Sequence, residues 1–163
     1  MEDYDVIVVG GGPAGASAAY FNAVAGKKVL LIEKADFPRD KICGDGVTGK
    51  SLQILHEMGL SKEIAGIKEI SCKEVLLSSP NQTCLTIPIT SPDEPLTAFC
   101  IEREVFDNVL YQKAVSAVLE NGGDILVEKV SSPLVENDIV VGINVKDKSY
   151  RASLVIMVLF LVL

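Results

Sequence analysis

The chain has 163 residues, of which 48% are hydrophobic and 23% are charged, and its formal net charge is -7. This length supports one domain with a real core, and the composition excludes a disordered or collagen-like chain. An acidic chain without a run of Lys and Arg is not expected to bind nucleic acid.

Cysteine and histidine usage argues against a metal site. The only histidine is His56, which we expect on the surface, and no two cysteines have the C-x-x-C spacing of zinc ligands. A strand predicted to begin almost at Met1 leaves no room for a signal peptide. We therefore expect a reducing, cytoplasmic compartment and free thiols. The four cysteines are Cys43, Cys72, Cys84 and Cys100.

The first 32 residues predict a βαβ unit. Residues 4–9 form a short apolar, β-branched run that is typical of a buried strand. Residues 13–25 are rich in alanine and predict a helix, with Pro13 in its first turn and Gly26 at its end. Residues 28–32 predict a second buried strand, so the two strands should be parallel and joined by a right-handed crossover.

A glycine-rich turn connects the first strand to the first helix. Residues 10–15 read Gly-Gly-Gly-Pro-Ala-Gly. Gly10 would permit the tight turn, Gly12 would let the backbone approach a pyrophosphate, and Gly15 would let the helix pack close to the sheet. The N–H groups of Ala14 and Gly15, which follow Pro13 in the first turn of the helix, would then face the phosphates. The alternative is a structural turn without a ligand.

Glu33 ends the second strand. A carboxylate at this position accepts hydrogen bonds from the ribose hydroxyls of a dinucleotide and would repel a 2′-phosphate, so NADP is not the expected ligand. The alternative is a solvated glutamate at a strand end. Together the turn and Glu33 indicate an adenine dinucleotide, and they do not separate FAD from NAD.

Further elements follow in chain order. Residues 35–47 predict a loop, and residues 48–59 predict a helix capped by Thr48. Between residues 68 and 100, short β-rich pieces alternate with turns and predict a second, antiparallel sheet. A long helix is expected over residues 102–121, and strands are expected over residues 124–128, 139–145 and 150–159. The apolar face predicted for the long helix comprises Val105, Val109, Tyr111, Val115 and Leu119.

The C-terminal residues 154–163 are all apolar. A membrane-spanning helix needs roughly 20 such residues, so this run is too short. Its first half predicts a fully buried parallel strand. Because the chain ends within this run, we expect it to be a fragment of a longer protein.

Three segments carry a family resemblance: residues 5–19, residues 37–48 and residues 101–110. The chain resembles the FAD-dependent oxidoreductases related to aromatic hydroxylases and, among them, the geranylgeranyl reductase family. The resemblance implies FAD as the cofactor, held by the glycine turn, Glu33 and its neighbour Lys34. It also implies that a Lys-x-Cys-Gly loop, matched here by Lys41, Cys43 and Gly44, wraps the flavin together with Gly46.

The same resemblance implies roles for three further residues. Cys43 would lie near the substrate pocket as a candidate catalytic residue; the alternative is a small residue buried in a turn. Arg103 would contact FAD through its fork of donors, and the alternative is an exposed arginine in the first turn of a helix. The backbone of Val130, within a residue or two, would touch the adenine.

By this resemblance, reduced FAD would deliver a hydride to isoprenoid C=C bonds of a polyprenyl lipid or quinone. An external electron donor and peripheral contact with a membrane are implied. The alternatives are an FAD-dependent monooxygenase or halogenase, and a non-catalytic fragment, because the family's Gly-Ala-Asp-Gly and later Gly-Asp segments are missing. The expected fold is α/β, with a Rossmann-like parallel sheet from residues 1–67 and 101–156, the start of an antiparallel β-rich substrate region over residues 68–100, and an apolar tail over residues 157–163.

Overall fold

The computed structural model describes residues 2–42, 46–67, 70–88 and 98–158. The chain divides into two compact units, Met1–Arg39 with Asp107–Leu163, and Asp40–Phe106. Within the described ranges, no helix is both long enough and apolar enough to cross a membrane.

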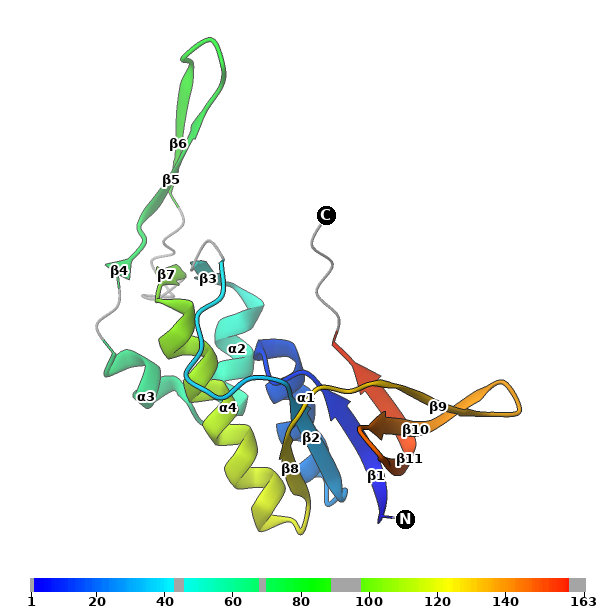
Figure 1. Cartoon of the computed structure of the whole chain (residues 1–163). Coiled ribbons are helices and arrows are strands. Elements are labelled where there is room, and N and C mark those ends of the chain that lie inside the picture. Colours follow the sequence, from blue (N-terminus) through cyan, green and yellow to red (C-terminus); the bar gives the residue numbers. More distant parts are fainter. Residues whose placement is uncertain (1, 43–45, 68–69, 89–97, 159–163) are drawn as a thin grey trace. The chain divides into compact units, whose positions relative to one another are not determined.

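A six-stranded sheet forms the centre of the first unit, with strand order β8-β2-β1-β11-β10-β9 (Figure 1). The first four strands in this order run parallel, and β10 and β9 continue the sheet in antiparallel fashion. The helices that contribute to this unit are α1 and most of α4. The bounds are β1 (Glu2–Val9), α1 (Pro13–Val24), β2 (Val29–Glu33), α4 (Arg103–Glu120), β8 (Asp124–Val127), β9 (Ser132–Glu136), β10 (Ile139–Val145) and β11 (Lys148–Met157).

The strand order places a topological switch at β1. After β1 the chain moves through α1 to β2 on one side, and it later returns to β11 on the other side of β1. In open α/β sheets, ligands bind beyond the carboxyl ends of the strands at such a switch point. The predicted βαβ unit and the predicted parallel sheet are therefore confirmed. The segment that follows Val9 lies at the carboxyl end of the strand at the switch point.

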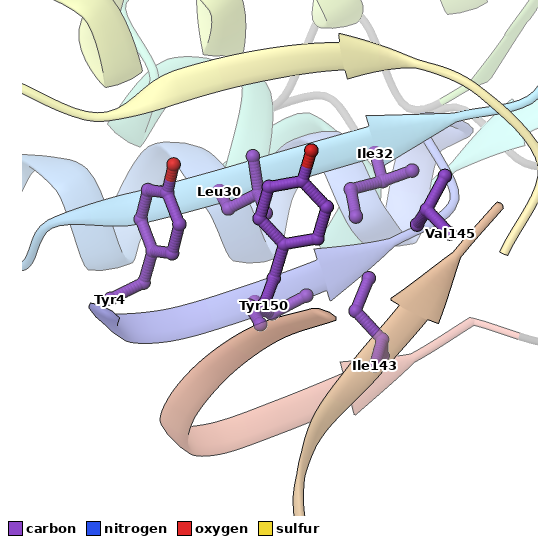
Figure 2. Close-up of a cluster of buried hydrophobic side chains, with 7 residues drawn as sticks. Tyr4, Leu30, Ile32, Ile143, Val145 and Tyr150 are labelled. Carbon is purple, nitrogen blue, oxygen red and sulfur yellow. The ribbon is translucent and has the colours of Figure 1, made fainter. Parts of the chain in front are cut away.

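A buried cluster packs across β1, β2, β10 and β11 (Figure 2). Tyr4, Ile143 and Tyr150 bring aromatic and branched side chains from three of these strands together. The Tyr4 hydroxyl donates a hydrogen bond to Asp124 Oδ2 over 3.0 Å, which satisfies its polar end. The cluster stabilises the pairing of β1 with both of its neighbours. Its other buried members are Ile7, Leu30, Ile32 and Val145.

The second unit contains two small antiparallel sheets, β3-β7-β4 and β5-β6, as the β-rich sequence predicts. Its helices are α2 and α3, and His56 on α2 is exposed. The bounds are β3 (Gly46–Thr48), α2 (Lys50–Glu57), α3 (Ser61–Ala65), β4 (Ile70–Ser71), β5 (Glu74–Ser78), β6 (Cys84–Pro88) and β7 (Ala98–Cys100).

Three sequence predictions about local structure are wrong. Thr48 does not cap α2, because it ends β3 opposite Ala98 of β7, and Gly49 is the N-cap instead. The predicted face of α4 is also wrong: of its five members only Tyr111 is buried, and the buried face includes Asp107. Finally, β11 is parallel to β1 as expected, but Leu154 is 50% exposed, so the strand is not fully buried.

Candidate cofactor site

The glycine turn after β1 allows very close packing of α1 onto the end of the strand. Gly10 has a φ of +106°, a conformation that favours glycine, and its N–H donates to Ile32 O over 2.7 Å. A Cβ on Gly15 would lie 1.7 Å from Gly10 O. No real side chain can stand at that distance, so the turn and the first turn of α1 require glycine at position 15.

The N-terminus of α1 offers backbone donors to a ligand. Gly12 is the N-cap and Pro13 occupies the first turn. Among the residues that the structure describes, no side chain caps this helix, and its first turn carries no acidic residue. Free N–H groups and the positive end of the helix dipole therefore remain available to an anion.

Glu33 lies beneath the turn and ties it to the end of β2. Its side chain is 6% exposed. Oε2 accepts the N–H of Gly11 over 2.7 Å, and Oε1 accepts the N–H groups of Lys34 and Ala35 over 2.9 and 3.2 Å. A carboxylate accepts about four hydrogen bonds, so Glu33 retains capacity for a ribose hydroxyl. This geometry disfavours the alternative of a solvated glutamate.

A stack of side chains that the sequence analysis did not anticipate adjoins the turn. The Tyr111 ring would stand 2.9 Å from a Cβ on Gly11. Phe37 stacks on Tyr111 with 4.1 Å between ring centroids and 9° between ring planes. The guanidinium carbon of Arg39 lies 4.8 Å from the centroid of the Phe37 ring. These side chains come from the segment after β2 and from α4.

Arg39 also has a charged neighbour. Its Nη1 lies 3.7 Å from Oδ2 of Asp107, a carboxylate that is fully buried on α4. The only sequence signals for this stack were an arginine in the loop after β2 and the Asp107-x-x-x-Tyr111 spacing, which places both side chains on one helix face.

Tyr111 makes the stability of the protein depend on pH in the alkaline range. Burial, followed by the nearby charges of Glu33 and Asp36, raises the Tyr111 pKa above its ordinary value of 10.0. Folding thus favours the neutral phenol, and this contribution to stability is complete below about pH 10 and is lost as pH rises through the raised pKa. We expect Tyr111→Phe to flatten the loss of stability between about pH 9 and about pH 11, measured by urea unfolding. A steeper loss in the variant than in the wild type would contradict this expectation.

The first unit brings together six of the residues predicted to hold the cofactor. Lys34 is also in this unit, and its side chain is exposed while its N–H binds Glu33. Val130 follows β8 and packs against the buried cluster of Figure 2. Contact of its backbone with adenine stays a prediction. The six are Gly10, Gly12, Pro13, Ala14, Gly15 and Glu33.

The remaining predicted residues fall in the second unit or outside the described residues. Lys41 is partly buried, Gly46 begins β3 with an exposed backbone, and Arg103 begins α4 and is partly buried. Their contacts with the flavin stay predictions. Cys43 and Gly44 lie outside the described residues.

The geometry of the first unit fits an adenine dinucleotide. A glycine cradle faces a helix N-terminus that no side chain caps within the described ranges, and a buried carboxylate with remaining acceptor capacity lies at the adjacent strand end. These features define the class of dinucleotide-binding α/β domains. A family model described as FAD binding domain matches residues 3–115. The chain therefore belongs to this family of FAD-dependent oxidoreductases, and FAD is its cofactor.

Relatives refine this assignment. The chain is 56% identical over 61 residues to menaquinone reductase of Mycobacterium tuberculosis, which covers 37% of this chain and 15% of that protein. It is 32% identical to digeranylgeranylglycerophospholipid reductase 1 of Methanococcoides burtonii over 95% of this chain and 37% of the relative. The resemblance inferred from the sequence motifs is thus confirmed.

A solved structure shares the fold. The myxobacterial chondrochloren halogenase CndH, described as an FAD-dependent halogenase, superimposes with a TM-score of 0.80 and 27% identity. The match covers 96% of this chain and 37% of the halogenase. The chain therefore spans well under half the length of each of these relatives.

Proposed function

We propose that this chain binds the ADP half of FAD in a flavoprotein that reduces isoprenoid C=C bonds of a polyprenyl lipid or quinone. The observation that carries the binding step is the buried Glu33 carboxylate, hydrogen-bonded to Gly11 N–H, next to a cradle that only glycine permits at position 15. The similarity to two proteins named as reductases supports the reaction and the substrate class.

Each predicted residue has its own task in this proposal. Amides at Gly12 and in the first turn of α1 hold the pyrophosphate, and Glu33 accepts a ribose hydroxyl. When bound and reduced, FAD supplies the hydride for saturation of the double bond. Lys41, Gly46 and Arg103 are proposed to approach the flavin, and Cys43 to lie near the substrate. The proposal includes an external electron donor and peripheral contact with a membrane.

Binding is tested with the purified chain. We expect the fluorescence or the visible spectrum of FAD to change on binding, and we expect ADP to compete with FAD. FMN lacks the adenylate that the turn and Glu33 recognise, so it should bind much more weakly. Equal affinity for FAD and FMN, or no competition by ADP, would contradict the assignment of the ADP half to this site.

A second candidate function follows from the similarity to the halogenase: an oxygen-dependent halogenation or hydroxylation. Anaerobic conditions with chemically reduced flavin distinguish the two reactions. A reductase saturates a geranylgeranyl lipid without oxygen, and the product gains hydrogen. Strict dependence of product formation on oxygen would favour the second candidate. FAD binding without turnover in either condition would favour a non-catalytic chain.

A further inference from the structure

Arg39 lies beside the glycine turn. A Cβ on Gly12 would lie 3.3 Å from Arg39 Nη2, so this amino group lies where the missing side chain of the N-cap residue would point. Gly12 is the residue whose lack of a Cβ lets a pyrophosphate approach the backbone. The guanidinium thus faces the position that the proposed function assigns to the phosphates.

The surrounding side chains hold Arg39 in this position. Nη1 lies 3.7 Å from Asp107 Oδ2, while Nη2 is directed toward Gly12. The Phe37 ring supports the guanidinium from below, and Tyr111 supports Phe37 in turn. The Arg39 side chain is 18% exposed and the Asp107 side chain is fully buried. A guanidinium fixed in this way loses little rotamer entropy when it binds a ligand.

The chemistry of the guanidinium matches a phosphate. It has five N–H donors in a planar fork, and the distance to Asp107 is longer than a hydrogen bond, so donors remain for a second anion. Arginine–phosphate pairs are charge-assisted and stronger than neutral hydrogen bonds. The helix N-terminus alone presents only neutral amides and a partial charge to a diphosphate that carries two negative charges.

We propose that Arg39 contacts a phosphate of the bound dinucleotide at Gly12 and that Asp107 positions its guanidinium. This inference rests on the proposed binding of the ADP half at the glycine turn. In this proposal Arg39 favours ligands that carry phosphates. The chain should therefore bind ADP more tightly than adenosine, and this preference should depend on residue 39.

The test compares ADP with adenosine on the 163-residue chain by isothermal titration calorimetry. We expect Arg39→Gln to weaken ADP by about tenfold or more and to leave adenosine unchanged, since loss of a charge-assisted hydrogen bond affects only the phosphate ligand. Arg39→Lys should restore part of the ADP affinity. The dependence of ADP affinity on salt should be shallower in Arg39→Gln than in the wild type. Lys27→Gln removes the same charge from an exposed position after α1, and it should behave as the wild type.

Asp107→Asn tests the positioning role. It should reduce the preference for ADP over adenosine by a smaller factor than Arg39→Gln, because the guanidinium remains but is less fixed. A melting temperature for each variant shows whether its fold is intact.

The outcomes separate this inference from the proposed function. A wild-type chain that binds neither ADP nor FAD contradicts the proposed function itself. If the wild type prefers ADP and folded Arg39→Gln keeps the same preference, only the role of Arg39 is refuted. Equal loss of ADP and adenosine affinity together with a lowered melting temperature would also refute it, since Arg39 would then only support the fold.

Discussion

Gly15→Ala is expected to destabilise the protein by about 3 kcal/mol or more, the upper range for forcing extra volume into a packed region. The new Cβ would lie 1.7 Å from Gly10 O and 2.9 Å from Gly10 C, and both atoms belong to the backbone. Neither can rotate away as a side chain could. Relief therefore requires α1 to move off the end of β1, which would also break the cradle for the phosphates. Urea unfolding followed by circular dichroism measures the loss, with no FAD present.

Gly12→Ala is the matched control for this substitution. Its Cβ would meet only Arg39 Nη2, at 3.3 Å, and the far end of an arginine side chain can shift. Gly12 has a φ of -67°, which alanine adopts without strain. We therefore expect a change in stability below about 1 kcal/mol and a clear loss of FAD affinity, because the methyl group occupies the approach of the pyrophosphate. Similar stability losses in the two variants would contradict the explanation based on backbone contact.

The parts of the fold that the sequence predicts are formed by residues close to one another in the sequence. The β1–α1–β2 unit follows from apolar runs, a proline in the first turn of the helix and glycines at both of its ends, all within 32 residues. The same short segment determines the cradle, since Gly15 and Gly10 are only five residues apart. Glu33 was identified for its position at a strand end, and the structure adds that it is buried and accepts a hydrogen bond from Gly11 N–H.

The parts that the sequence did not predict depend on distant partners. Thr48 has the residue type of a helix cap, but pairing with Ala98 of β7, fifty positions away, places it in a strand. Strand β9 was missed because Pro133 is unfavourable in a strand interior, whereas β9 is an edge strand and tolerates it.

The error on α4 had the largest consequence for the site. Counting apolar residues selected the valines of the helix, yet the face that is buried carries a charged residue, Asp107, and Tyr111. Asp107 is buried with Arg39 Nη1 3.7 Å from its Oδ2, and no local pattern relates an arginine after β2 to an aspartate on a helix 68 residues later. Hydrophobic periodicity therefore missed the residues that surround Arg39.

The resulting site has donors and acceptors at separate places. Backbone amides at the start of α1 and the Arg39 guanidinium lie around Gly12, where negative phosphates would bind. Glu33 lies at the neighbouring strand end, beneath Gly11. An ADP group has negative phosphates at one end and ribose hydroxyls next to them. In one orientation the phosphates lie at the donors and a ribose hydroxyl lies at Glu33. The reverse orientation would place phosphates against a carboxylate.

Glu33→Gln is expected to weaken both the fold and the recognition of the ribose. The wild-type carboxylate accepts three backbone N–H groups, from Gly11, Lys34 and Ala35. A glutamine amide has one oxygen and one NH2 group, so at least one of these buried donors would face another donor. An unsatisfied buried donor costs about 1 to 3 kcal/mol, and we expect a loss of about 2 kcal/mol in the free energy of unfolding.

The ribose effect is measured separately, as the ratio of the affinities for ADP and 2′-deoxy-ADP. The wild type should prefer ADP because Glu33 accepts a ribose hydroxyl, and Glu33→Gln should lose most of that preference while its affinity for inorganic pyrophosphate stays the same. Glu120→Gln removes a carboxylate from the exposed end of α4 and should change neither quantity. Glu33→Gln could instead retain both its stability and its preference for ADP over 2′-deoxy-ADP. That result would contradict both roles of the carboxylate, because the three N–H donors and the ribose hydroxyl would then not need its negative charge.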